Sequence, residues 1–223
     1  QAARVLRADF ELLDVDSEKS ITEFAERLRA RYGRLDVLVN NAATIGVPST
    51  PFAERTEPTL RTNFYGLMML TDAVMPLLRA SATSGGRPRI VNLASDRGHL
   101  AQLSGGLPAK FSSPKLERAG LLELVQKFKD DVEAGCHLRE GWGDSNYGFS
   151  KLAVIALTKV LAREEGRAMK INAVNPGYCR TDMTGGGGHR TAEQGARTPA
   201  MLALLPDSGP TGHFYMDGTP ISW

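Results

Sequence analysis

Cysteine is scarce in this chain: Cys136 and Cys179 are the only two among its 223 residues. Two cysteines are too few for a disulfide framework or a cysteine-based zinc site, so the composition favours a reducing compartment such as the cytoplasm. No apolar run reaches the roughly 18 residues that a membrane-spanning helix needs, and none is expected. The four histidines show no metal-ligand spacing, so the sequence predicts no metal site.

A strong charge of one sign is also lacking. The formal net charge is +2, and the basic residues are spread along the chain, which favours neither nucleic acid nor an anionic membrane as a partner. The chain is, however, long and hydrophobic enough for a folded domain. With 223 residues and 42% hydrophobic side chains, the chain can bury one sizeable core. We therefore expect residues 1–223 to form a single domain.

Short apolar runs alternate with longer helical patterns. Strands are predicted at residues 10–15, 37–39, 90–93 and 170–174, and helices at residues 17–32, 56–78 and 145–163. Strands separated by helices predict an α/β fold with a doubly wound parallel sheet, arranged in three Rossmann-like layers. Ligands of such folds bind beyond the carboxyl ends of the strands.

Tyr147 and Lys151 lie four residues apart at the start of a predicted helix. This spacing places a phenol and an ammonium on one helix face. A cation favours the phenolate, so the pair can serve as an acid and base near neutral pH. The same spacing is also typical of a solvated surface pair, and alone it does not separate the two readings.

Two further polar residues occupy positions that suggest a role. Ser95 follows the strand predicted at residues 90–93, where its hydroxyl can donate to a substrate carbonyl or can cap a turn or helix. Asn63 lies in the middle of a predicted helix, where a short amide is a poor helix former. It is therefore either a functional residue or a polar surface position.

Several motifs follow one another along nearly the whole chain. They are Asp14 with Val15, then Asn40, Asn41 and Ala42, then Asn63, Ser95, Tyr147 with Lys151, and Pro176 with Gly177 and Thr181. This ordered set resembles the short-chain dehydrogenase/reductase family. Residues 140–142, 180–183 and 202–206 and the last residue, Trp223, are most similar to the monomeric NADPH-dependent carbonyl reductases within it.

The resemblance implies an oxidoreductase that reduces the carbonyl of a ketone, aldehyde or quinone by hydride transfer from NADPH. Tyr147 would protonate the carbonyl oxygen, and Ser95 would hold and polarise that oxygen. Lys151 would hydrogen-bond the nicotinamide ribose and lower the pKa of Tyr147. Asn63 would hold a water that links Lys151 to solvent.

The resemblance also implies a row of cofactor contacts: a strand end at the adenine, a loop at the ribose and a loop at the nicotinamide amide. The residues are Asp14, Val15, Asn40, Asn41, Ala42, Tyr147, Lys151, Pro176, Gly177, Cys179 and Thr181. NADP is implied by analogy alone, and NAD stays an alternative because the segments that choose between the two cofactors are not in this sequence.

Residues 96–146 form a long insertion between Ser95 and Tyr147. About 50 residues separate the two, whereas typical members of the family span this gap with roughly a dozen. Ser113 and Pro114 look like a helix start, and an apolar face follows, formed by Leu121, Leu124, Phe128 and Val132 and ending at Gly135. A partner-binding excursion or a mobile lid is the alternative. The resemblance implies a monomer whose insertion borders the substrate cleft, with Tyr178 and Met183 as its apolar walls or as core residues.

The family's glycine-rich turn is missing from this sequence. It should precede Asp14 by roughly fifty residues, and only 13 residues stand there. Such a turn binds the cofactor pyrophosphate at a helix N-terminus. We therefore expect a fragment that lacks the first β-α-β unit, with a bare edge on the strand at residues 37–39. Two functions stay open: a reductase whose amino-terminal part lies outside this sequence, and a truncated relative that binds no dinucleotide and acts through protein contacts.

Overall fold

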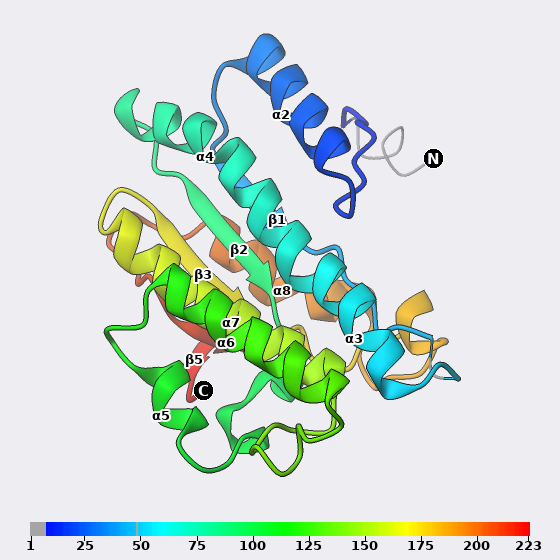
Figure 1. Cartoon of the computed structure of the whole chain (residues 1–223). Helices are drawn as coiled ribbons and strands as arrows, with labels where there is room; N and C mark the ends of the chain where they lie inside the picture. Colours follow the sequence, from blue (N-terminus) through cyan, green and yellow to red (C-terminus); the bar gives the residue numbers. More distant parts are fainter. Residues whose placement is uncertain (1–7, 48) are drawn as a thin grey trace.

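The computed structural model describes residues 8–47 and 49–223, and helices cover both faces of a five-stranded sheet (Figure 1). The strand order is β1-β2-β3-β4-β5. The first four strands are parallel, and β5 pairs antiparallel with β4. The strands are β1 (Val37–Asn40), β2 (Arg89–Leu93), β3 (Lys170–Val174), β4 (Phe214–Met216) and β5 (Thr219–Ile221). The doubly wound α/β fold is thus confirmed, with a closing hairpin that the sequence pattern did not indicate.

The helices belong to two layers. Helices α4 and α7 pack on one face of the sheet and α8 on the other. The α-helices are α2 (Glu18–Tyr32), α3 (Phe52–Leu60), α4 (Leu67–Thr83), α5 (Leu107–Ser112), α6 (Arg118–Glu133), α7 (Asn146–Glu165) and α8 (Ala192–Ala203). Successive strand residues point to opposite faces of the sheet, so the Ile90 side chain packs on the α4–α7 face and that of Val91 on the α8 face. This is the pattern expected of strands with both faces covered.

Helix α2 confirms the prediction for residues 17–32. Ser17 caps its first turn by accepting a hydrogen bond from Ser20 N, and Gly33 ends it with a φ of 71°. Both are the residue types preferred at those positions. Its buried residues are Ile21 and Ala25.

The strand predicted at residues 10–15 is wrong. The segment is irregular as far as residue 14 and turns at residues 15–16. Phe10 and Leu12 are 76% and 74% exposed. Side chains of α2 hold the segment, since Arg27 bonds both Glu11 and the Leu12 carbonyl. A strand needs a neighbour to pair with, and no described strand lies beside this segment.

Strand β1 forms one edge of the described sheet. The edge predicted for residues 37–39 is therefore present, and Val39 is 44% exposed on it. Asn40 at its end is buried, because its amide donates to Thr71 Oγ1 at 3.1 Å and to Asn92 Oδ1 at 2.8 Å. These bonds attach β1 to α4 and β2.

The predicted helix at residues 56–78 is longer and not regular. Its α-helical parts, α3 and α4, are joined by a π-helical segment, η1 (Arg61–Gly66). Wider turns of this kind often occur at functional sites. The segment places Asn63 fully inside the protein, so a polar surface position for Asn63 is excluded.

The insertion at residues 96–146 adds helices α5 and α6 beside α7. The helix start predicted at Ser113 and Pro114 is wrong: Ser113 ends α5, and α6 begins only at Arg118. The proline that fits a first helical turn is Pro108, near the start of α5. The predicted apolar face of α6 is buried, and Phe128 stacks on Phe149 of α7 with a centroid distance of 3.8 Å. The insertion therefore packs against the helix that carries Tyr147.

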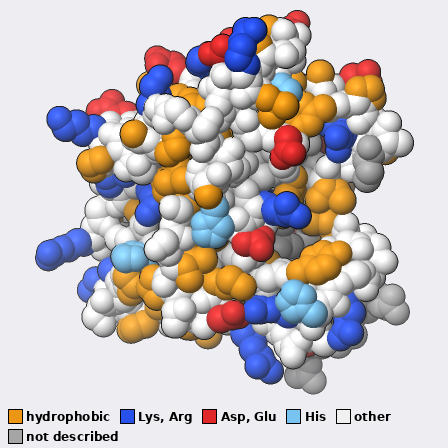
Figure 2. All heavy atoms as spheres, turned by 90° about the horizontal axis from the view of Figure 1, so that it is seen from below, with side chains coloured by type: hydrophobic (Ala, Val, Ile, Leu, Met, Phe, Trp, Pro, Cys, Tyr) orange, Lys and Arg blue, Asp and Glu red, His pale blue; other side chains and the backbone are white. Residues whose placement is uncertain are grey.

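Among residues 8–47 and 49–223, no helix has the length and apolar character needed to span a membrane. Seen from below Figure 1, basic and acidic side chains are interspersed with hydrophobic ones (Figure 2). In the same described ranges, no group of three or more His, Cys, Asp and Glu side chains could hold a metal ion.

Candidate active site

Tyr147 and Lys151 lie in the first two turns of α7. Ser145 caps the helix by accepting from Gly148 N at 2.9 Å. The Lys151 Nζ lies 5.6 Å from the centroid of the Tyr147 ring and donates to the Leu93 carbonyl at 2.8 Å. Lys151 is only 3% exposed. A solvated surface pair is therefore excluded.

Burial sets the pKa of both groups. It raises the pKa of Tyr147 above its usual value near 10, while the nearby Ser95 hydroxyl lowers it and Asp96 raises it further. Burial also lowers the pKa of Lys151 to about 8. The lowering of the pKa of Tyr147 by Lys151 stays a prediction, because in this structure desolvation of the phenol outweighs the other influences on its pKa.

Ser95 lies at the carboxyl end of β2, as the sequence predicts. Its hydroxyl donates to Asp96 Oδ1 at 2.9 Å and accepts from Arg97 N at 3.2 Å, which caps a short 3₁₀ helix, η2 (Asp96–Gly98). The capping role that the sequence left open is therefore present. It leaves Ser95 close enough to Tyr147 to affect the pKa of the phenol.

Gly98 presses this turn onto α7. A Cβ atom at this position would lie 2.9 Å from the carbonyl carbon of Lys151 and 3.0 Å from Leu152 N. Such separations are too short for real side chains, so only glycine allows this approach. The Trp223 indole donates to the Gly98 carbonyl at 2.9 Å and holds the turn from its outer side.

Asn63 binds a neighbouring loop through its side chain. Its Oδ1 accepts from Thr44 N at 2.7 Å, and its Nδ2 donates to Thr44 O at 2.8 Å and to Ser150 Oγ at 2.9 Å. Ser150 in turn donates to the Tyr147 carbonyl at 2.8 Å. Asn63 therefore connects the loop after β1 to the first turn of α7.

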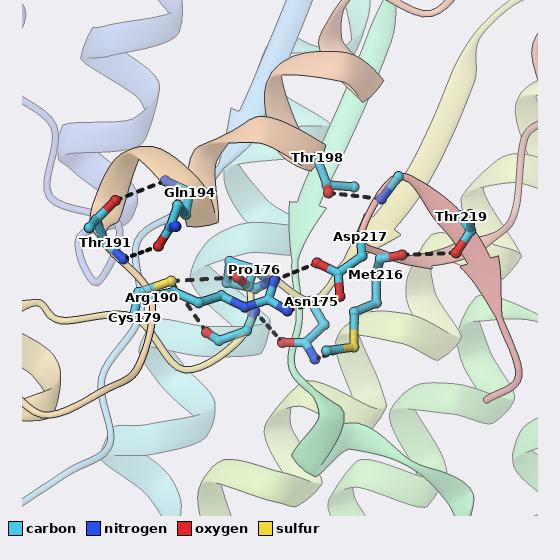
Figure 3. Close-up of polar contacts among 12 residues, drawn as sticks. Asn175, Pro176, Cys179, Arg190, Thr191, Gln194, Thr198, Met216, Asp217 and Thr219 are labelled. Atoms are coloured by element: carbon cyan, nitrogen blue, oxygen red, sulfur yellow. Dashed lines mark hydrogen bonds and ion pairs between the residues drawn. The ribbon is translucent and has the colours of Figure 1, made fainter.

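The loop after β3 is held by bonds within itself and to the carboxyl-terminal hairpin (Figure 3). Asn175 accepts from Gly177 N at 2.9 Å, and its amide approaches Met216 Sδ at 3.4 Å. The Cys179 thiol points to the carbonyl of Pro176 at 3.4 Å. Thr181 is exposed and caps a 3₁₀ turn, η4 (Asp182–Thr184).

The remaining predicted cofactor contacts are divided between surface and core. Asp14 is exposed and accepts from Asp16 N at 2.9 Å, and the Val15 carbonyl lies against Gly66, where a Cβ would be 2.5 Å away. Asn41 and Ala42 are exposed just beyond β1, whereas Asn40 is buried. The predicted walls Tyr178 and Met183 are also exposed and are not core residues.

Comparisons with known proteins agree with this geometry. A family model described as short chain dehydrogenase matches residues 2–118, and one described as enoyl-(acyl carrier protein) reductase matches residues 136–205. Carbonyl reductase [NADPH] 1 of Bos taurus is 37% identical, over 96% of this chain and 79% of the relative. Carbonyl reductase [NADPH] 3 of Rattus norvegicus is 38% identical, over 99% of this chain and 82% of that protein.

The chain belongs to the short-chain dehydrogenase family. Solved structures support the same assignment. Salutaridine reductase from Papaver somniferum has a TM-score of 0.86 and 27% identity, over 96% of this chain and 84% of that one. Menthone neomenthol reductase from Mentha piperita has a TM-score of 0.74 at 27% identity, over 92% and 77% of the two chains.

In this short-chain dehydrogenase, Ser95, Tyr147 and Lys151 come together at the carboxyl end of β2. Two residues of the site were not found from the sequence, Ser150 and Gly98. Ser150 had a local signal, because it lies three residues after Tyr147 on the same helix face. Gly98 had none, since the approach of its backbone to α7 depends on the tertiary structure.

Proposed function

We propose that this chain carries the catalytic residues of an NADPH-dependent carbonyl reductase, which reduces a small ketone, aldehyde or quinone. The names of its curated relatives support the activity and the cofactor. The observation that carries the proposal is that buried Lys151 and half-buried Tyr147 lie beside Ser95. A phenol, an ammonium and a hydroxyl at the end of a central strand are suited to protonating a carbonyl oxygen.

Tyr147 is the proton donor in this proposal. Its raised pKa keeps the phenol neutral at physiological pH, which is the form that can give a proton to the carbonyl oxygen. Ser95 polarises that oxygen, and its hydroxyl must turn from Asp96 to the substrate to do so. Bound NADPH would supply the hydride, and these residues position the carbonyl group and protonate its oxygen.

Lys151 fits a site for the hydroxyl groups of a nicotinamide ribose. An ammonium has three N–H donors, and Leu93 O is the one hydrogen-bond acceptor that the described residues give to Nζ. A buried donor without a partner costs free energy, so ribose hydroxyls would satisfy the remaining two. With a pKa of about 8, Lys151 is mainly the ammonium at pH 7.

The role of Asn63 in proton supply stays a proposal, which assigns the water to its main chain. Its side-chain amide is used by Thr44 and Ser150. A water that links Lys151 to solvent would therefore meet the Asn63 carbonyl oxygen. We propose that the cofactor contacts the Pro176 loop on one side and the exposed residues Asn41 and Ala42 on the other.

The insertion supports a monomer. Helix α6 covers α7 and α3 with its apolar face, so these helices are not free for a second copy. Tyr178 and Met183 remain the proposed apolar contacts of the substrate, because both are exposed beside the Pro176 loop. One domain spanning residues 1–223 fits the continuous sheet.

The proposal is tested on protein purified from the full coding sequence, with any residues that precede residue 1, because a glycine-rich turn binds the cofactor pyrophosphate. This protein is incubated with NADPH labelled with deuterium at the transferred position and a panel of quinones, aromatic ketones and aldehydes. The expected result is an alcohol or hydroquinone product together with oxidised cofactor. Alcohols formed from ketones and aldehydes should carry deuterium on the former carbonyl carbon. Absence of NADPH oxidation with every compound would contradict the proposal. Parallel reactions with NADH test the choice of cofactor.

A further inference from the structure

Arg190 and Asp217 form a bidentate ion pair beside the loop after β3. Nη1 lies 2.5 Å from Oδ1 and Nη2 lies 2.8 Å from Oδ2. Figure 3 shows the Arg190 side chain reaching across the loop toward the turn that joins β4 and β5. Two parallel bonds fix the plane of the guanidinium as well as its position.

The Arg190 side chain lies directly on Gly177. A Cβ at Gly177 would be 2.7 Å from Arg190 Nε and 2.8 Å from its Cδ. Gly177 also has a φ of +79°, a backbone conformation that other residues adopt only with strain. The left-handed backbone conformation of the loop at Gly177 therefore lies where the Arg190 side chain covers it.

The main chain of Arg190 is bound to the same loop. Arg190 N donates to Tyr178 O at 3.2 Å, and Arg180 N donates to Arg190 O at 2.9 Å. Both the backbone and the side chain of Arg190 thus contact residues 177–180. A shift of Arg190 would move the loop with it.

Asp217 is itself fixed in place. It has a φ of 50° and is the one residue other than glycine with a positive φ in the described part of the chain. The next residue, Gly218, donates from its N–H to Thr198 Oγ1 of α8 at 3.1 Å. The β4–β5 turn is thereby held by α8 and offers a fixed anion to Arg190.

We infer that Arg190 and Asp217 are positioning residues that hold the Pro176–Gly177 loop in the shape that receives the nicotinamide. This inference rests on the proposed function, because it assumes that the loop meets that part of NADPH. Neither residue is needed for proton transfer, and both lie away from Tyr147 in the chain. Breaking the pair should therefore weaken cofactor binding and leave the chemical step nearly intact.

The test uses Arg190→Gln, Asp217→Asn and the double variant. We expect each single variant to raise the KM for NADPH several-fold, with kcat changed less than about twofold when menadione is the acceptor. The double variant should be no worse than the worse single variant, because both changes remove one shared interaction. An unchanged KM for NADPH, or additive losses, would overturn the inference.

A readout that needs no turnover is amide hydrogen exchange in residues 177–188. We expect faster exchange there in Arg190→Gln and unchanged exchange in α7. Unchanged exchange in this loop would overturn the inference even if the enzyme is active. If the unaltered protein oxidises no NADPH, the proposed function fails, while exchange still reports whether the pair holds the loop.

Arg87→Gln is the matched control. Arg87 forms a comparable surface pair with Asp207 at 3.3 Å, before the amino end of β2 and thus at the opposite end of the sheet. It should leave the KM for NADPH and the exchange of residues 177–188 unchanged. Equal effects of Arg87→Gln and Arg190→Gln would show a general loss of charge or stability and would overturn the inference.

Discussion

Lys151 Nζ donates to the Leu93 carbonyl oxygen at 2.8 Å, which ties the second turn of α7 to the end of β2. The ammonium is buried there, no carboxylate of residues 8–47 and 49–223 forms an ion pair with it, and burial lowers its pKa to about 8. The folded protein thus holds a cation at a cost in stability. Such a cost is typical of groups that are retained for function.

Lys151→Met should stabilise the protein at neutral pH. Because the pKa is about 8 in the folded state against 10.5 for an ordinary lysine, charged Lys151 destabilises the fold below pH 8, by about 3 kcal/mol. This cost decreases as pH rises from 8 to 10.5, so the unaltered protein gains stability in that window. Urea unfolding should show an advantage for Lys151→Met of about 3 kcal/mol at pH 7 and about 1 kcal/mol at pH 9.5.

The comparison stops at pH 9.5 because, above pH 10, Tyr147 changes the stability of the folded protein in the opposite direction. Its pKa is raised in the folded state, so ionisation of the unfolded phenol lowers stability there. Lys19→Met, at an exposed lysine, is the control and should leave the free energy of unfolding nearly unchanged. A constant difference between Lys151→Met and the unaltered protein from pH 7 to 9.5 would contradict the burial argument.

Gly98→Ala should disturb the site through backbone contact. The added methyl would lie 2.9 Å from the Lys151 carbonyl carbon, which forces η2 away from α7. We expect a loss of about 1–3 kcal/mol in unfolding free energy and a lower kcat, since Ser95 begins the displaced turn. Gly106→Ala is the control, because no atom lies within 4 Å of its added Cβ; equal behaviour of the two variants in thermal unfolding and turnover would refute the contact.

Asn63→Ala should detach the loop after β1. It leaves the N–H and carbonyl of Thr44 and the Ser150 hydroxyl without their bonds to the amide, so a loss of about 2–4 kcal/mol is expected. Thermal unfolding and exchange of the Thr44 amide measure it. Protection of Thr44 equal to that in the unaltered protein would contradict the described role.

Local signals in the sequence predicted the elements that depend on local interactions. Ser17 and Gly33 bound α2 because capping is decided within a few residues. The strand at residues 10–15 had an equally apolar pattern, yet a strand forms only with a partner. Strands β4 and β5 were missed because each spans three residues, too short for a period to be visible.

The sequence predicted which side chains of the candidate site lie together, but not their energetics. Spacing placed Lys151 one helical turn after Tyr147, but the sequence gives no measure of burial, which determines the direction of both pKa shifts. The π-helical turn at Asn63 and the pairing of Arg190 with Asp217, 27 residues apart, carry no local pattern. Such features depend on how distant segments meet.

Tyr147→Phe is the most direct test of the central claim. The substitution removes the hydroxyl and keeps the ring over which Lys151 lies. Single-turnover kinetics with NADPH and menadione should show a loss of at least about 100-fold in the rate of NADPH oxidation, with NADPH affinity within about twofold by fluorescence titration. Tyr32→Phe, an exposed tyrosine on α2, is the control and should react at the normal rate. A Tyr147→Phe protein that oxidises NADPH as fast as the unaltered one would contradict the assignment of Tyr147 as proton donor.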